Sequence, residues 1–295
     1  MTDPGLVIAH FGRSWALESD DGRIALCEAR RHCTPPCVGD RVMWQPTGPD
    51  HGIILEVLPR RTLLTRPGRG GKLRPVAANL DQVLIVIAPE PPYDLLLVDQ
   101  YLVVCEHHHL QPVILLNKTD LVTPTEWSRI EADLAPYRNL YPLLSVSAKT
   151  GEGMEALHAI LKGKTSMFAG QSGVGKSSLL KTLIPDKEIR IGALSSSTRR
   201  GRHTTTSAML FHLKEGGDII DTPGVSVFGL ANIDPHRLAD GYKEFRPFAE
   251  QCRFNDCRHA GDLGCRVKQA VDEGKISAAR YRRYLKLLQK LPEIS

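Results

Sequence analysis

The chain has 295 residues and a formal net charge of +5 at pH 7. Its hydrophobic fraction of 42% and charged fraction of 24% are ordinary for globular proteins and exclude a disordered or collagen-like chain. No run approaches the roughly 20 apolar residues that span a bilayer, and residues 1–12 lack the pattern of a secretory signal. We therefore expect a cytoplasmic protein of two or three domains that does not associate with a membrane.

Residues 1–62 are predicted to form short β-strands. Apolar and polar residues alternate in residues 5–10, 14–17, 23–27 and 52–58, which favours half-buried strands. Asp20, Asp21 and Gly22 are typical of a hairpin turn, since Asp and Gly tolerate the positive φ that tight turns need. Several short strands in so small a segment predict a closed barrel of the oligonucleotide-binding (OB) type, with an SH3-like barrel as the alternative.

Residues 63–78 are rich in basic residues, glycine and proline, and this composition predicts a linker. Basic side chains around it could contact RNA phosphates, although a solvated linker explains the composition equally well. The candidate RNA contacts are Arg60, Arg61, Arg66, Arg69, Lys72 and Arg74.

Residues 79–230 alternate between buried strands and helices. Continuous apolar runs at residues 82–88, 112–116, 143–146, 165–169 and 218–220 are typical of strands buried on both faces. Helices are expected at residues 94–108, from residue 125 and at residues 177–183, with Thr123 and Pro124 beginning the second of them. The pattern predicts an α/β domain with a parallel sheet.

A phosphate-binding loop is predicted between one of these strands and the helix that follows it. The sequence has a glycine, four further residues and then glycine-lysine-serine, a spacing that lets backbone N–H groups point at phosphate oxygens. In this pattern Lys176 neutralises the β- and γ-phosphates and assists catalysis, and the Ser177 hydroxyl ligates Mg²⁺. The phosphate-binding residues are Gly170, Gln171, Ser172, Gly173, Val174, Gly175, Lys176, Ser177 and Ser178.

Two further motifs follow buried strands and indicate guanine recognition. In the first, the Asp120 carboxylate can accept both N1–H and the exocyclic amine of guanine, a donor pair that adenine lacks. Asn117 would tie the loop to its neighbours, and the Lys118 stem would lie over the base. The second motif is Ser147, Ala148 and Lys149, where a backbone N–H can reach the guanine oxygen.

The residues expected at the metal and the attacking water lie later in the chain. Asp221 ends a buried strand and could hold Mg²⁺ through water, and Gly224 would bring its N–H to the γ-phosphate. Thr205 is the preferred switch threonine for Mg²⁺, with Thr204 as the alternative. Val225 stands where many GTPases have a water-orienting glutamine, so His203 is the candidate to position the water, with an ordinary surface histidine as the alternative.

Residues 231–295 contain a predicted zinc site. Cys252, Cys257, His259 and Cys265 supply three thiols and one imidazole at short spacing, a set that suits a closed structural Zn²⁺ site. A helix is expected at residues 277–291, with an apolar stripe and a basic remainder that includes Arg280, Arg282 and Arg283. A second cluster, formed by His32, Cys33 and Cys37, is interpreted as unrelated to metal.

The motifs occur in an order rotated from that of ordinary GTPases, with the guanine-reading motifs before the phosphate loop. In this order and in the zinc segment, the sequence resembles the ribosome-small-subunit-dependent GTPase family known as RsgA or YjeQ. The resemblance covers essentially the whole chain. It implies a circularly permuted P-loop GTPase domain between an N-terminal OB barrel (residues 1–62) and a mainly helical zinc domain.

The resemblance also implies partners and an activity. Members of that family bind the small (30S) ribosomal subunit and its rRNA late in maturation and hydrolyse GTP to GDP faster when bound. We expect the same here, with Mg²⁺ and one structural Zn²⁺ as cofactors and a monomeric chain. Two alternatives stay open: a GTP-dependent metallochaperone using Cys33 and Cys37, and an RNA-binding module in which the nucleotide is only structural.

Overall fold

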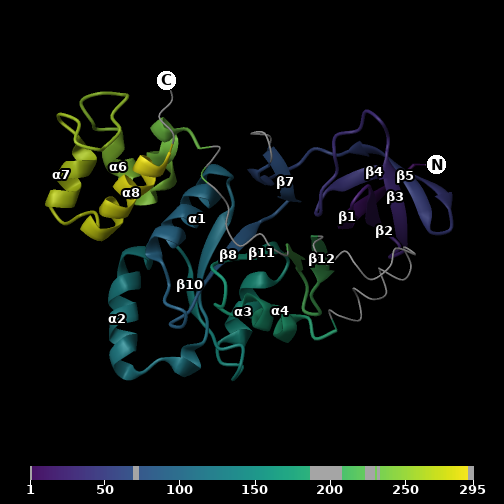
Figure 1. Ribbon diagram of the computed structural model, residues 1–295, viewed down its shortest axis with the longest axis horizontal. Coiled ribbons are helices and arrows are strands. Elements are labelled where there is room, and N and C mark those ends of the chain that lie inside the picture. Colours follow the sequence, from purple (N-terminus) through teal and green to yellow (C-terminus); the bar gives the residue numbers. More distant parts are fainter. Residues whose placement is uncertain (1, 69–72, 187–207, 223–229, 231–232, 292–295) are drawn as a thin grey trace.

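The computed structural model describes residues 2–68, 73–186, 208–222, 230 and 233–291. Three units lie along its long axis (Figure 1). The N-terminal barrel and the C-terminal helical unit are at opposite ends, and the α/β domain lies between them. One core connects all three units, because the same cluster of buried residues contains Ala9 of the barrel, Leu84 of the central sheet and Tyr284 of the C-terminal unit.

The N-terminal unit is a five-stranded barrel, formed by β1 (Asp3–Phe11), β2 (Ser14–Ser19), β3 (Ile24–Ala29), β4 (Arg41–Gly48) and β5 (His51–Val57). The strands pair in the closed order β1-β2-β3-β5-β4-β1, with only the β3–β5 pairing parallel, an arrangement that fits the OB type. Strand β4 was not predicted, because it contains Pro46 and because two register shifts disturb the alternation of apolar and polar residues along it.

Residues 63–78 differ from the predicted linker. They form an antiparallel hairpin of β6 (Leu63–Pro67) and β7 (Leu73–Ala78). The end of the hairpin at which Leu64 pairs with Ala77 is packed into the shared core, because both side chains are buried there. The glycines that contributed to the linker prediction stand at positions 68, 70 and 71, in the sequence between the two strands.

The central domain contains a six-stranded section of the sheet in the order β10-β9-β8-β11-β13-β12. The first five strands are parallel, and the edge strand β12 is antiparallel. The strands are β8 (Gln82–Ile87), β9 (Gln111–Leu116), β10 (Leu143–Ser145), β11 (Thr165–Ala169), β12 (Met209–His212) and β13 (Asp218–Asp221). This confirms the expected parallel sheet of an α/β domain.

In the described part of the domain, the α-helices between these strands are α1 (Leu95–His107), α2 (Pro124–Leu134), α3 (Met154–Leu161) and α4 (Lys176–Leu183). A short 3₁₀ turn, η2 (Thr119–Leu121), precedes α2, and another, η3 (Ala135–Tyr137), follows it. Thr123 caps α2 as predicted, since its side chain accepts from the Glu126 N–H while the Glu126 carboxylate accepts from the Thr123 N–H.

The C-terminal unit consists of short helical segments around an aromatic core. They are η4 (Pro235–Gly241), η5 (Lys243–Phe245), α6 (Arg246–Ala249), α7 (Arg266–Asp272) and α8 (Ala278–Lys290). The predicted apolar stripe of α8 is buried at Tyr281, Tyr284 and Leu288. In the part of the chain that the structure describes, no helix is long and apolar enough to cross a membrane.

Two α8 residues expected on the basic face turn inward. The Arg280 side chain is only 1% exposed, and its Nε lies 2.6 Å from Glu244 Oε1. Arg283 donates from Nε to the buried Asp99 carboxylate of α1, at 2.5 Å. The basic remainder of the helix is therefore not all exposed, because carboxylates from other parts of the sequence pair with these two arginines.

Candidate nucleotide site and metal centre

The phosphate loop occupies the turn between β11 and α4. Gly170 begins this loop with a φ of +138°, and a Cβ there would lie 2.3 Å from the Val86 carbonyl oxygen of β8. Gly175 precedes the first residue of α4 with a φ of +94°. Only glycine fits both positions without strain, and the loop therefore curls so that α4 begins at the phosphate site.

Lys176 points back into the loop. Its Nζ donates to the carbonyl oxygens of Gly170 and Gln171, at 2.6 and 2.7 Å. Partial burial lowers the pKa of this ammonium. Ser177 and Ser178 are exposed in the first turn of α4. A bound phosphate would give Lys176 the anion that its partly buried charge favours.

Asn117 connects the phosphate loop to both guanine-reading motifs. It follows β9 and is 1% exposed. Its Nδ2 donates to the Val174 carbonyl oxygen at 2.9 Å, and its Oδ1 accepts from the Ala148 N–H at 3.2 Å. The structure thus brings together three motifs that are separated in the sequence, at the carboxyl edge of the parallel sheet, where ligands bind in such folds.

Asp120 presents its carboxylate beside the second guanine-reading motif. Oδ1 accepts from the Ser147 hydroxyl at 2.6 Å, and Oδ2 lies 3.8 Å from the Lys149 Nζ. The Ser147 hydrogen bond, with a smaller contribution from Lys149, lowers the pKa of Asp120. The group is therefore ionised at neutral pH and can accept the two donors of guanine.

A wall of the site comes from a segment that the sequence reasoning missed. Lys118, in the left-handed conformation, donates from Nζ to the Glu90 carbonyl oxygen at 2.7 Å. Gln171 Nε2 donates to the Pro92 carbonyl oxygen at 2.8 Å. The loop after β8 therefore supports both Lys118 and the phosphate loop. Its proline-rich sequence directly after a buried strand was the available signal.

The metal-side residues are only partly described. Asp221 is the last residue of β13. Strand β13 pairs in parallel with β11, the strand that leads into the phosphate loop, so Asp221 lies on the neighbouring strand. Thr222 donates from its hydroxyl to the Met167 sulfur at 3.6 Å. His203, Thr204, Thr205 and Gly224 lie outside the described residues.

The four predicted zinc ligands gather in one place. Their ligand atoms all lie within 4.8 Å of one another. His259 Nδ1 lies 3.6 Å from the Cys252 Sγ, 3.4 Å from the Cys257 Sγ and 3.5 Å from the Cys265 Sγ. Sulfur and nitrogen ligands placed about 2.3 and 2.0 Å from a tetrahedral Zn²⁺ lie about 3.5 Å apart, so the spacing fits this ion.

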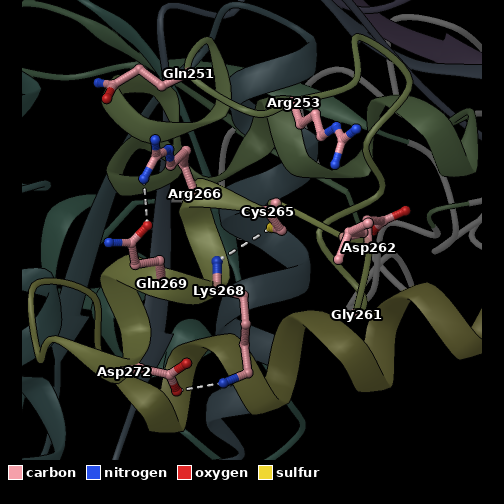
Figure 2. A pocket seen from close by; sticks show the side chains of 11 residues that line it. Gln251, Arg253, Gly261, Asp262, Cys265, Arg266, Lys268, Gln269 and Asp272 are labelled. Atoms are coloured by element: carbon pink, nitrogen blue, oxygen red, sulfur yellow. Dashed lines mark hydrogen bonds and ion pairs between the residues drawn. The ribbon is translucent and has the colours of Figure 1, made fainter.

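Backbone groups around this cluster suit thiolate ligands. The Arg266 N–H donates to the Cys252 Sγ and the Lys268 N–H to the Cys265 Sγ, both at 3.3 Å. Burial lowers the pKa of His259, which favours the neutral imidazole that a metal requires. Figure 2 shows a pocket lined by Cys265, with Arg253 and Arg266 among its other residues. The volume of this pocket is about 710 Å³.

The second cysteine cluster does not resemble a metal site. Burial strongly raises the pKa of Cys37, which keeps its thiol protonated. Cys33 donates its thiol to the Thr34 carbonyl oxygen. Among the described residues, the metal-binding geometry of histidine, cysteine and acidic groups is met at the C-terminal cluster alone.

The candidate RNA contacts divide into two groups. Arg60 is held by the fully buried Asp40, with Nε 2.7 Å from Oδ1 and Nη2 2.8 Å from Oδ2, so it has a structural role. Arg61 pairs with Asp81. Arg66 and Arg74 are exposed and lie directly opposite each other on the hairpin. Arg69 and Lys72 lie outside the described residues.

Three features together define a circularly permuted GTPase. The chain has a P-loop, a buried asparagine joins this loop to an aspartate-bearing loop, and the base-reading motifs precede the P-loop in the sequence. The family model described as RsgA GTPase matches residues 57–231. The chain belongs to the RsgA GTPase family.

Similar proteins match over nearly the whole length. "Small ribosomal subunit biogenesis GTPase RsgA" of Azotobacter vinelandii is 46% identical over 294 residues, which cover 98% of this chain and 86% of that protein. The protein of the same name from Pseudomonas aeruginosa is 45% identical, with the same two coverages. The crystal structure of YjeQ from Thermotoga maritima has a TM-score of 0.81 and 34% identity, and covers 98% of both chains. The structure of YloQ, a circularly permuted GTPase, has a TM-score of 0.78 and 28% identity, and covers 98% of this chain and 95% of its own.

Proposed function

We propose that this chain hydrolyses GTP to GDP and phosphate and acts with the small ribosomal subunit during the subunit's maturation. The observation that carries the enzymatic part is the Asn117 hydrogen-bond pattern, which joins the phosphate loop to the predicted guanine-reading loops. The names of the relatives, small ribosomal subunit biogenesis GTPases, support the biological part.

Within this pocket each residue has a proposed role. Asp120 selects guanine, while Lys118, Ala148 and Lys149 surround the base. Residues 170–178 cradle the phosphates, with Lys176 next to the bridging oxygen that leaves. Mg²⁺ would be held by Ser177, Thr205 and Asp221 and would neutralise the charge that develops on the phosphates. His203 would position the attacking water, and the Gly224 N–H would contact the γ-phosphate.

We further propose that the subunit accelerates turnover by ordering groups around the γ-phosphate. This follows from Val225 in the usual glutamine position, which leaves the water without that partner. The chain is proposed to bind the rRNA of the subunit. It is also proposed to act as a monomer in the cytoplasm.

The decisive measurement is GTP turnover by the purified protein with and without 30S subunits. We expect slow turnover alone, faster turnover with the subunit, and none with Lys176→Ala. GTP bound but not hydrolysed on 30S subunits would favour the structural-nucleotide alternative. Indifference to 30S subunits, together with loss of activity in Cys37→Ala, would favour the metallochaperone.

We also propose one structural Zn²⁺, held by Cys252, Cys257, His259 and Cys265. Four protein ligands close the coordination shell, so the ion would stabilise the loops between α6 and α7 and take no part in hydrolysis. Metal analysis should give one zinc per chain in the wild-type protein and less in Cys257→Ser. GTP affinity should be retained in that variant, because the nucleotide pocket belongs to the central domain.

A further inference from the structure

An ionic bridge joins the barrel to the central domain. His212, the last residue of β12, lies between one carboxylate from each unit. Its Nδ1 is 2.6 Å from Asp218 Oδ1 on β13, and its Nε2 is 2.5 Å from Glu18 Oε2 on β2. Only the imidazolium form has an N–H on both nitrogens and can donate to both carboxylates at once.

The two carboxylates stabilise that charged form. The hydrogen bond to Asp218 and then the bond and charge of Glu18 raise the pKa of His212 to about 9, against the opposing effect of partial burial. The bridge is therefore ionic at neutral pH. Because the His212 side chain is 49% exposed, the bridge adds little to overall stability, and its effect is on the orientation of the two units.

The bridge belongs to a hairpin that reaches the nucleotide site. Strand β12 pairs His212 with Asp218 at one end and Met209 with Asp221 at the other. Met209 also pairs with Ala9 of β1 in the barrel. Asp221 lies three residues beyond Asp218 on β13, about 10 Å along the strand. Glu18 is thus connected to the candidate magnesium residue Asp221 through the His212 side chain and the short strand β13. A displacement of Glu18 can therefore be passed on along this path.

Further contacts between the barrel and this region are uncharged. The Ala78 N–H donates to the Val38 carbonyl oxygen at 2.9 Å, and Asn79 Nδ2 donates to the Gly39 carbonyl oxygen at 2.8 Å. A Cβ at Gly39 would lie 2.2 Å from the Ala78 carbonyl oxygen, so the backbones are in close contact. These neutral, tightly packed contacts and the Ala9–Met209 pairing hold the barrel against the central domain, and the His212 bridge adds a charged contact to them.

We propose that His212 is a positioning residue for stimulated GTP hydrolysis, which transmits the position of the barrel through β13 to Asp221. This inference rests on the proposed function, because it assumes that the small subunit accelerates turnover, and it adds that the bound subunit shifts the barrel. In this proposal, the Glu18–His212–Asp218 bridge couples the binding of the partner to the nucleotide site.

The test compares His212→Gln and Glu18→Gln with two matched controls, His51→Gln and Glu28→Gln, at exposed positions of the barrel. We expect the first two variants to keep the wild-type basal kcat, the KM for GTP and, in sedimentation assays, the affinity for 30S subunits. Their 30S-stimulated kcat should fall about fivefold or more. The double variant should lose no more than either single variant, and the controls should behave as the wild type.

An NMR titration of the His212 imidazole, assigned by its absence in His212→Gln, tests the bridge separately. We expect a midpoint near pH 9 in the wild type and a lower one in Glu18→Gln. A wild-type midpoint near the ordinary value, an unchanged stimulated rate in both variants, or a loss of 30S affinity that accounts for the lower rate would each overturn the coupling. Absence of stimulation in the wild type would overturn the proposed function itself, and with it the coupling, while the titration still reports whether the bridge exists.

Discussion

At the scale of single residues, the candidate nucleotide site depends on a few side chains with specific hydrogen-bond partners in neighbouring loops. Asn117 satisfies a carbonyl oxygen of the phosphate loop and an N–H of the second guanine-reading motif. Asp120 is oriented by the Ser147 hydroxyl. These contacts fix the positions of the loops at the candidate site, so a single changed atom should alter which nucleotide the site accepts.

Asp120→Asn should change base selectivity. The asparagine amide has one acceptor and one donor group, so it cannot accept both donors of guanine. We expect GTP affinity to fall by about 100-fold or more, and xanthosine triphosphate, which has an oxygen in place of the exocyclic amine, to bind better than GTP. Calorimetry with both nucleotides measures this, with Asp50→Asn in the exposed β4–β5 turn as the control. Equal GTP affinity in the variant would remove Asp120 from the base site.

Gly175→Ala should abolish nucleotide binding. The added Cβ would lie 2.2 Å from the Asn117 Nδ2, at a φ of +94°. Gly163→Ala is the matched control, since its φ is +70° but no heavy atom lies within 4 Å of the added Cβ. The control should lose about 1 kcal/mol in the free energy of unfolding and keep its GTP affinity. If both variants bind GTP alike, the Asn117 contact is unimportant.

At the scale of elements, α8 shows why an amphipathic pattern predicts only part of an interface. Its apolar residues could be assigned to the core from their spacing. Arg280 and Arg283 could not, because arginine is usually exposed and their partner Asp99 lies 184 positions before Arg283. The Arg280 guanidinium also lies 4.6 Å from the centre of the Tyr137 ring and 5.2 Å from that of Tyr242. Charge and aromatic rings together fix α8 against the central domain.

Arg280→Met should destabilise the protein strongly. Methionine fills similar space but leaves the buried Glu244 and Asp99 carboxylates with less compensating charge. Breaking such a buried pair costs about 3–5 kcal/mol. Urea denaturation measures the free energy of unfolding, and the exposed Arg282→Met should stay within about 0.5 kcal/mol of the wild type. An equal, small effect of both substitutions would show that the cluster does not hold α8.

The elements of the central domain were largely predictable, whereas their neighbours were less so. Buried parallel strands have continuous apolar runs, and β11 falls at the predicted residues 165–169. The hairpin β6–β7 was taken for a linker, since short strands rich in arginine and proline lack that signal. The wall formed by Glu90 and Pro92 was missed because it acts through carbonyl oxygens, which no side-chain pattern reveals.

At the scale of the whole molecule, the central domain is held at both ends of the long axis (Figure 1). Charged contacts take part at each end: the His212 bridge to the barrel and the Arg280 cluster to the C-terminal unit. The motif order could be read from the sequence, but these interfaces could not, because each depends on side chains from distant parts of the chain. The hairpin β6–β7 adds a further surface beside the barrel.

The double variant Arg66→Gln/Arg74→Gln should weaken subunit binding. The two exposed guanidinium groups lie directly opposite each other, an arrangement that repels itself and that a phosphate would stabilise. We expect lower 30S affinity and a salt dependence less steep by about two in the logarithmic slope. Lys162→Gln/Lys214→Gln, at two exposed positions of the central domain, removes the same charge and should bind like the wild type. Equal affinity of the two double variants would exclude the hairpin as an RNA contact.

The short turn between α3 and β11 explains how the rotated motif order is tolerated. In ordinary GTPases the phosphate-loop strand comes first and the base-reading motifs come last. Here Leu161 ends α3 and Thr165 begins β11, so three residues join these two ends, with the Lys164 N–H donating to the Leu161 carbonyl oxygen at 3.1 Å. The strands and helices of the domain can therefore be joined in a closed cycle, and the chain can begin and end at different points of this cycle. Here the chain instead leaves the domain after β13, so the strand that carries the candidate magnesium residue Asp221 continues towards the C-terminal unit. The point at which the chain leaves the domain therefore determines which further unit is attached closest to the candidate nucleotide site.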